Sequence, residues 1–345
     1  MPLPDREREV LTTIIEAYIT TALPVGSRAV SRQSHLGLSP ASIRNLMADL
    51  TEAGYLEQPH TSAGRVPTAK AFRLYLDEVM RERPLPEAHK RRIATMLRSA
   101  GLDLGDILRQ ASRLLSGLSL QVAMVVSPRY PDTRWKRIDF SLLNPGLVMA
   151  ILVLQGGLVR NRIIETAVEV TADDLVGYAN YLNHLFTDRT VAEVRSRLVA
   201  ELREAERTLN ALYQRALTLA QAAFEHEPEP ASEVIVDGAS NILSQPEFMS
   251  AEQMREVMRV LEERTILLEL LDKTATDLRP VVTIGSETAL DVLTELGVIT
   301  APYGTGSGPQ GAIGLIGPVR MDYAGLVPVV NFTASALTRL LDRHF

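Results

Sequence analysis

The spacing of apolar residues divides the chain into a helical start, a β-rich stretch, a second helical stretch and a β-rich end. Within residues 5–53 the spacing predicts three short helices that stop at Gly54. An apolar-polar run at 55–58 and a second short strand before a helix opening at Thr68 enclose a polar loop. Three helices followed by two strands around a polar loop are typical of a winged helix-turn-helix.

The rest of the chain alternates between strand and helix patterns. Four β-rich runs within 120–165 are separated by turn residues, so we expect an antiparallel meander. Residues 171–225 have helical spacing, and strand patterns return from residue 281 before a last helix near 333–343. This order predicts an α+β multidomain protein in which one antiparallel α+β domain is interrupted by a mostly helical insertion.

The predicted domain boundaries follow these changes of pattern. We expect a winged-helix domain at 1–83 and a linker with a connecting helix at 84–101. The α+β domain follows in two parts, at 102–170 and 250–345, with the insertion at 171–249 between them. Within the insertion, apolar residues from Leu198 to Ala223 recur as a heptad, which fits packing inside its own domain or pairing with a second subunit. A winged-helix protein that reads an inverted repeat must dimerise, which favours the second interpretation.

Composition excludes several classes of protein. The net charge of −6 and the pI of about 5.6 argue against a protein that coats nucleic acid with its whole surface. The chain has no cysteine, which excludes disulfides, cysteine-ligated zinc and iron–sulfur clusters and fits a reducing cytoplasm. The longest apolar run, Leu147 to Leu154, has the length of a strand, so we expect no membrane partner.

The third predicted helix has the composition of a DNA recognition helix. Ser39 and Pro40 open it, and an expected buried stripe (Ile43, Leu46, Leu50, Ala53) leaves small and polar residues on the other side: Ala41, Ser42, Arg44, Asn45 and Ala48. Arginine and asparagine recognise guanine and adenine edges in the major groove. An ordinary solvated helix face is the alternative, but residues 23–75 hold six basic residues against three acidic ones. This local excess favours DNA.

The wing and the helix starts supply the other expected DNA contacts. Thr61 and Ser62 are short donors, Gly64 permits the turn, and Arg65 is the expected contact to phosphate or the minor groove. We expect three further residues near helix N-termini to position phosphates: Ser27, Arg28 and Ser39. His60 fits either a bond to local backbone or a DNA contact.

No pattern predicts catalysis. The six histidines are scattered, no metal-ligand spacing occurs, and no serine lies in a nucleophile elbow, so we expect no enzyme, no metal and no cofactor. One run, Gly306 to Gly311, matches GxGxxG, and a regulator that senses a ligand or nucleotide through Gly304–Gly311 is the alternative function. Because Pro309 intrudes and a strand-like run follows, we favour a hairpin loop.

Four runs in the chain resemble the heat-inducible transcription repressor HrcA family. They are PVGS at 24–27, SIRNLMA at 42–48, QPHTSAGRVPT at 58–68 and IGPVRMDY at 316–323. The resemblance extends from about Arg8 to Tyr323, and none of its departures (Ser42, Ala71-Phe72 and Val319) changes Arg44, Asn45 or Arg65.

The resemblance implies a cytoplasmic bacterial repressor that binds an inverted-repeat operator upstream of chaperone operons as a homodimer. It implies that the α+β domain is GAF-like and that the insertion is a dimerisation domain. It also implies that the GroE chaperonin keeps the repressor active until heat stress occupies the chaperonin with unfolded clients. We expect no small-molecule effector in the GAF-like domain.

Overall fold

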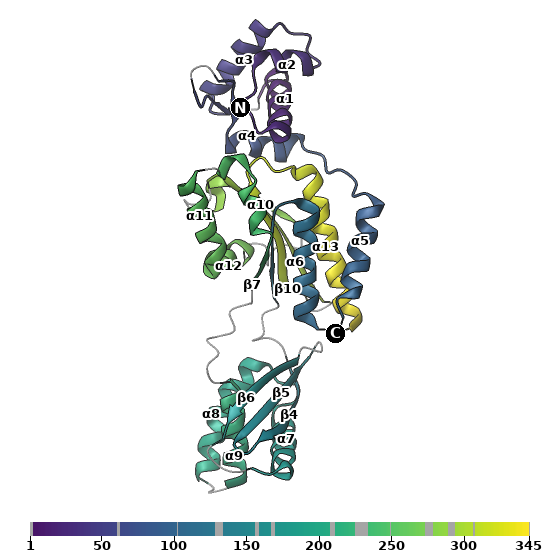
Figure 1. Cartoon of the computed structure of the whole chain (residues 1–345), viewed down its shortest axis with the longest axis vertical. Helices are drawn as coiled ribbons and strands as arrows, with labels where there is room; N and C mark the ends of the chain where they lie inside the picture. Colours follow the sequence, from purple (N-terminus) through teal and green to yellow (C-terminus); the bar gives the residue numbers. More distant parts are fainter. Residues whose placement is uncertain are drawn as a thin grey trace.

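A computed structural model describes residues 3–60, 63–101, 103–127, 134–155, 159–166, 170–207, 211–224, 234–248, 250–272, 279–288, 294–305 and 308–344. Figure 1 shows three parts along its long axis. We call them the winged-helix unit (3–80), the middle unit (85–127 and 234–344) and the insertion unit (134–224), each within the described ranges.

The winged-helix unit has the predicted order of elements. These are α1 (Asp5–Thr21), α2 (Ser27–Gln33), α3 (Pro40–Glu52), β1 (Leu56–Glu57), β2 (Val66–Pro67) and α4 (Ala69–Leu74), which continues as the π-helix η1 (Tyr75–Val79). β1 and β2 pair antiparallel, and an isolated bridge adds Val25 beside Arg65. The buried stripe of α3 is Ile43, Met47 and Leu50, with Leu46 half-buried, so the expected burial of Ala53 was wrong.

The middle unit is a five-stranded antiparallel sheet between two helical layers (Figure 1). The strand order is β7 (Val234–Asp237), β3 (Val122–Val126), β10 (Gly308–Pro318), β9 (Leu296–Thr305) and β8 (Val281–Ile284). One face packs on α6 (Leu104–Ser119) and α13 (Tyr323–His344), with α5 (Glu87–Ser99) beside them. The other packs on α10 (Ala239–Leu243), η2 (Pro246–Phe248), α11 (Ala251–Glu262) and α12 (Arg264–Asp272).

Burial on both faces explains the apolar strand β3. Ala123 and Val125 belong to the core beneath α6 and α13, whereas Val122, Met124 and Val126 belong to the core beneath α10–α12. Successive side chains of a strand point to opposite faces, so both sets must be apolar. α13 is the one described helix long and apolar enough to cross a membrane, and 50% of that segment is buried. Its packing on β9, α5 and α6 makes it a core helix.

The insertion unit differs from the predicted helical insertion. The meander β4 (Trp135–Asn144), β5 (Leu147–Leu154) and β6 (Val159–Glu165) is antiparallel as predicted, but it forms its own sheet, apart from β3. It shares a core with α7 (Ala172–Phe186), α8 (Val191–Arg207) and α9 (Ala211–Phe224). The sequence placed this meander in the α+β domain, so the expected boundary at 171 and the helical character of the insertion were wrong.

One amide shows why the meander packs with the insertion helices. Asn183 of α7 accepts hydrogen bonds from the Ile138 backbone N–H at 2.7 Å and the Trp135 ring N–H at 3.2 Å, and donates to the Ile138 carbonyl at 2.9 Å. The Trp135 ring packs on Phe186, with centroids 5.6 Å apart. A capping box of Thr171 and Asp174 starts α7.

Two helical stretches of the chain are each divided into two helices. The heptad from Leu198 to Ala223 spans α8 and α9, which pack against each other. Leu198, Ala216 and Leu219 are buried in the core of the insertion unit, so the heptad positions described there pack within their own unit. The helical stretch after Ser250 is likewise divided into α11 and α12 at Glu263.

Candidate nucleic-acid interface

The exposed face of α3 is as predicted. The Ser39 hydroxyl accepts a hydrogen bond from the Ser42 backbone N–H at 3.2 Å, and Pro40 occupies the first turn, so the helix start is fixed by local chemistry. The buried stripe turns the other side to solvent, where five residues are exposed: Ala41, Ser42, Arg44, Asn45 and Ala48. Because Ala41, Ser42 and Ala48 are short, a groove of DNA can approach the helix closely between the longer Arg44 and Asn45 side chains.

Several polar side chains near this face are free to bind a ligand. Arg44 and Asn45 have no hydrogen bond or ion pair to any described residue, and the same is true of Arg28 and Arg32 on α2, which packs on α3. Arg28 and Arg32 are both exposed and one helical turn apart, so they lie on one side of α2. The candidate list from the sequence omitted Arg32, although its four-residue spacing from Arg28 was visible there.

Only part of the excess positive charge in residues 23–75 is available to bind DNA. Lys70 donates to the Ala53 carbonyl at 2.8 Å and lies over the Tyr55 ring. Arg65 donates to the Thr51 hydroxyl at 3.1 Å, and Arg73 binds residues of the middle unit. Less positive charge is therefore available to DNA than the six basic residues suggest, because these three cations already have partners within the chain.

The wing is partly described. Thr61 and Ser62 lie outside the described residues. Gly64 passes directly against Val25: a Cβ built on Gly64 would lie 2.4 Å from the Val25 carbonyl oxygen. Close backbone approach is therefore the reason for glycine here. The Val25 N–H donates to the Arg65 carbonyl at 2.8 Å, and the Arg65 N–H donates to the Val25 carbonyl at 2.9 Å.

The helix starts differ in detail from expectation. Ser27 is half-buried and is the first residue of α2, with Gly26 as the N-cap. The Ser39 hydroxyl is engaged by Ser42, including a hydroxyl contact at 3.0 Å. Arg28, which follows Ser27 in α2, is exposed. His60 is exposed and its carbonyl accepts from the Ala63 N–H, which fits a wing-base position.

The glycine-rich run near residue 306 connects paired strands. β9 and β10 are antiparallel neighbours on either side of it, with Gly308 opposite Thr305. A dinucleotide loop leaves a strand and opens a helix, and here a strand follows instead. Among the described residues no group of three or more His, Cys, Asp or Glu could hold a metal ion.

Comparison with known proteins identifies the family. Residues 105–327 match the family model described as "HrcA protein C terminal domain". Over nearly its whole length the chain is similar to "Heat-inducible transcription repressor HrcA" of Nitratidesulfovibrio vulgaris (strain DSM 19637 / Miyazaki F), with 46% identity over 99% of this chain and 97% of the relative. The relative of that name in Geobacter sulfurreducens is 41% identical over 98% of each chain.

The fold is also similar to a solved structure. A crystal structure described as that of a hypothetical protein matches 99% of this chain and 99% of its own, with a TM-score of 0.63 and 24% identity. The named relatives are transcription repressors rather than enzymes, and they cover the winged-helix unit that the family model leaves out. The chain belongs to the HrcA family of heat-inducible transcription repressors.

Proposed function

We propose that the chain represses chaperone operons by binding an inverted-repeat operator as a homodimer in the cytoplasm. The observation that carries this proposal is the exposed face of α3, where the Arg44 and Asn45 side chains have no partner among the described residues and lie beside Ser42 and two alanines. In the major groove, Arg44 recognises guanine and Asn45 recognises adenine, while Ser42 contacts a base edge or phosphate.

The residues around α3 hold the DNA backbone in this proposal. Arg28 and Arg32 on α2, with Ser27 and Ser39 at the helix starts, face the phosphates that flank the groove. The wing follows the neighbouring backbone through Thr61, Ser62, Gly64 and Arg65. Phosphate contacts of this kind set affinity and register, and the base contacts set sequence preference.

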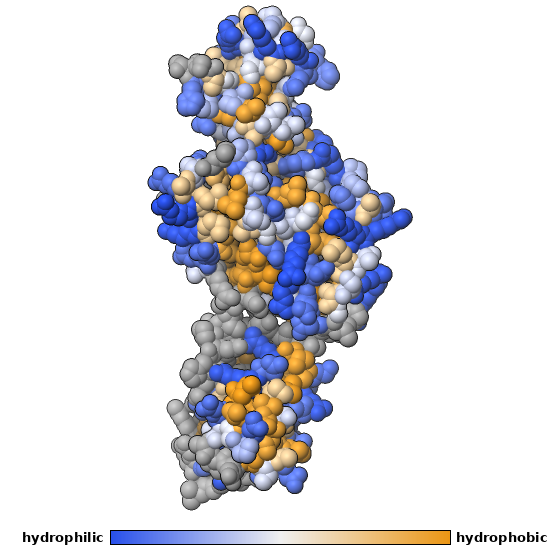
Figure 2. Space-filling model, in the orientation of Figure 1, coloured by the Kyte–Doolittle hydropathy of each residue, from blue (hydrophilic) through white to orange (hydrophobic). Residues whose placement is uncertain are grey.

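An exposed sheet face of the insertion unit supports the dimer, because apolar side chains lie on it among polar ones such as Arg137, Asp139 and Asn161. On the face of β5 away from the helices, Met149 lies opposite Ile163 and Val153 opposite Val159, and Ile151 lies between them. Ile163 and Val159 are 62% and 56% exposed. Figure 2 shows apolar residues gathered on the insertion unit. A second copy of the same sheet face would cover this surface, as expected of an isologous interface.

The remaining parts of the proposal follow from the family. We infer that the middle unit is the GAF-like domain and that the GroE chaperonin maintains the active repressor. Addition of purified chaperonin should then raise the fraction of repressor that binds operator, and an unchanged fraction across chaperonin concentrations would contradict that regulation. The alternative of nucleotide sensing through Gly304–Gly311 has little support, because the run joins antiparallel strands.

Titration of duplex DNA tests the proposed function. The unaltered protein should prefer an inverted repeat, selected in vitro from random duplexes, over a scrambled duplex of equal length. The preference should be smaller in Arg44→Ala and in Asn45→Ala, because each variant loses recognition of one base. Arg98→Ala is a matched control, because Arg98 is an exposed arginine on α5 without a described partner. Equal binding of the selected and scrambled duplexes by the unaltered protein would contradict the proposal.

A further inference from the structure

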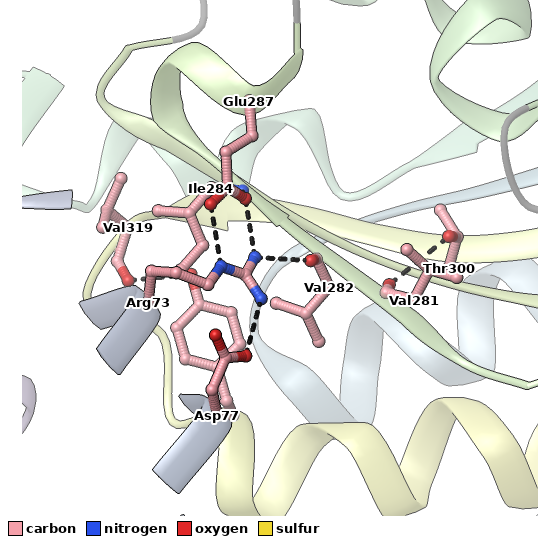
Figure 3. A network of polar contacts seen from close by, with 9 residues as sticks. Arg73, Asp77, Val281, Val282, Ile284, Glu287, Thr300 and Val319 are labelled. Carbon is pink, nitrogen blue, oxygen red and sulfur yellow. Dashed lines mark hydrogen bonds and ion pairs between the residues drawn. The ribbon is translucent and has the colours of Figure 1, made fainter. Parts of the chain in front are cut away.

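An arginine of the winged-helix unit is held by the middle unit. Figure 3 shows the Arg73 guanidinium between Glu287 and Asp77. Its Nε and Nη2 donate to the two carboxylate oxygens of Glu287 at 2.7 and 2.6 Å, and Nη2 also donates to the Val282 carbonyl at 2.8 Å. Nη1 donates to Asp77 of its own helix at 3.3 Å. Paired bonds between a guanidinium and a carboxylate fix orientation as well as distance.

The partner carboxylate is itself fixed in place. Glu287 lies in the short helix η3 (Gly285–Thr288), which follows the edge strand β8, and its Oε2 accepts from the Ile284 backbone N–H at 2.9 Å. Burial raises the pKa of Glu287, but the hydrogen bonds from Arg73 and from Ile284 outweigh it, so the pKa is below its ordinary value. Beside this pair Gly285 lies close to α4: a Cβ built on Gly285 would lie 3.4 Å from the Ala69 Cβ.

Two more polar contacts join the same units at other points. Arg320, which follows β10, forms an ion pair with Glu247 and donates to the Ile19 carbonyl of α1 at 3.4 Å. Arg83 forms an ion pair with Asp322, and its backbone N–H donates to the Ala324 carbonyl at 2.9 Å. Contacts at α4, at the end of α1 and in the linker define one orientation between the two units.

We propose that Arg73 and Glu287 are positioning residues for operator binding: their paired contact sets the angle of the winged-helix unit on the middle unit and thereby the distance between the two recognition helices of the dimer. This role rests on the proposed dimeric DNA binding. Glu287 belongs to the middle unit and acts through Arg73. Figure 1 places α3, the proposed recognition helix, on the far side of α4 from that unit.

The physical reason is the geometry of an inverted repeat. Two recognition helices must enter major grooves a fixed distance apart, about 34–36 Å for half-sites one turn apart. When the angle of each winged-helix unit is fixed, binding of the first half-site presents the second unit at high effective concentration. Loss of the Arg73–Glu287 contact frees that angle, so binding to two half-sites weakens while binding to one does not.

Comparison of a full operator with a single half-site tests this role. The full site is the inverted repeat selected by the unaltered protein, and the half-site duplex keeps one arm and scrambles the other. Arg73→Ala and Glu287→Ala should each bind the full site roughly ten-fold more weakly and the half-site within about two-fold of the unaltered protein, a size typical of coupling between sites. The double variant should be no weaker than either single variant, because both remove the same contact.

Arg109→Ala is the matched control, since Arg109 pairs with Asp106 within α6, away from the winged-helix unit. It should change neither affinity. An unchanged ratio of full-site to half-site affinity in Glu287→Ala would overturn the positioning role while leaving the proposed function intact. Equal weakening of both sites in Arg73→Ala alone would also overturn it, because it would make Arg73 a DNA contact. If the unaltered protein does not prefer the full site to the half-site, the dimeric binding itself fails, and this role fails with it.

Discussion

The Arg65 guanidinium of the wing donates from Nε to the hydroxyl of Thr51, near the C-terminal end of α3, at 3.1 Å. The same residue pairs through its backbone with Val25, just before α2. Arg65 therefore links the wing to both helices of the helix-turn-helix. Its remaining guanidinium N–H groups bind no described residue and are available for a phosphate.

These two functions of Arg65 can be separated by substitution. Arg65→Ala removes a charge, so the dependence of log affinity on log salt should become shallower by about 0.9 if Arg65 contacts one phosphate. Thr51→Val removes the hydroxyl, which accepts from Arg65 and donates to the Met47 carbonyl at 2.7 Å, but removes no charge. It should therefore weaken operator binding without changing that slope. Salt titrations by fluorescence anisotropy measure both. An unchanged slope in Arg65→Ala would make the residue a purely internal link.

Gly64 should resist any side chain. Because a Cβ would lie 2.4 Å from the Val25 carbonyl oxygen, Gly64→Ala must displace the wing strand or Val25. We expect a loss of about 1–3 kcal/mol in the free energy of unfolding of the winged-helix unit, as for other overpacked sites. Gly117→Ala is the control, since nothing lies within 4 Å of its Cβ position inside α6 and alanine there should stabilise by about 0.5–1 kcal/mol. Urea denaturation followed by circular dichroism measures the free energy of unfolding of both variants and shows whether each substitution destabilises or stabilises the protein.

The winged-helix unit could be predicted because each of its elements has a local signal. The Ser39 cap and Pro40 fix the start of α3, and Gly54, with a φ of +76°, follows its end. The exposed face of α3 then follows from helical spacing alone. No long-range contact was needed to place Arg44 and Asn45.

Which of the two larger sheets each strand joins could not be predicted from such local signals. An apolar strand such as β3 indicates that both its faces are covered, but not by which elements. The bonds from Asn183 that tie the meander to α7 span 45 residues. Likewise, the partner of Arg73 lies 214 residues further along the chain, so the local excess of basic residues looked more available for DNA than it is.

A charge on the open sheet face should separate the subunits. Ile163 is 62% exposed beside Met149, so Ile163→Asp should leave the folded unit intact and desolvate a carboxylate only in the dimer. Sedimentation should show a monomer at concentrations where the unaltered protein is a dimer. Leu243→Asp, at a residue 55% exposed in the middle unit, is the control and should remain a dimer.

The Arg73–Glu287 contact should depend on pH in one direction. The pKa of Glu287 is below its ordinary value of 4.5, so ionised Glu287 stabilises the folded state above that pH, and the contribution is lost as pH falls through the folded pKa. Glu287→Gln should therefore be less stable than the unaltered protein near neutral pH, and the difference should shrink in acid. Thermal unfolding at a series of pH values measures it, and a difference that grows in acid would contradict the assigned charge state.

The central claim is that α3 reads bases through its exposed face, and Asn45 tests it most directly. The measurement is the affinity of the unaltered protein and of Asn45→Ala for a set of operators, each with one symmetric base-pair change. We predict that the variant loses about 1–3 kcal/mol of discrimination at one base-pair position and keeps its preferences at the others. A uniform loss at every position, or no loss at any, would contradict base reading by α3.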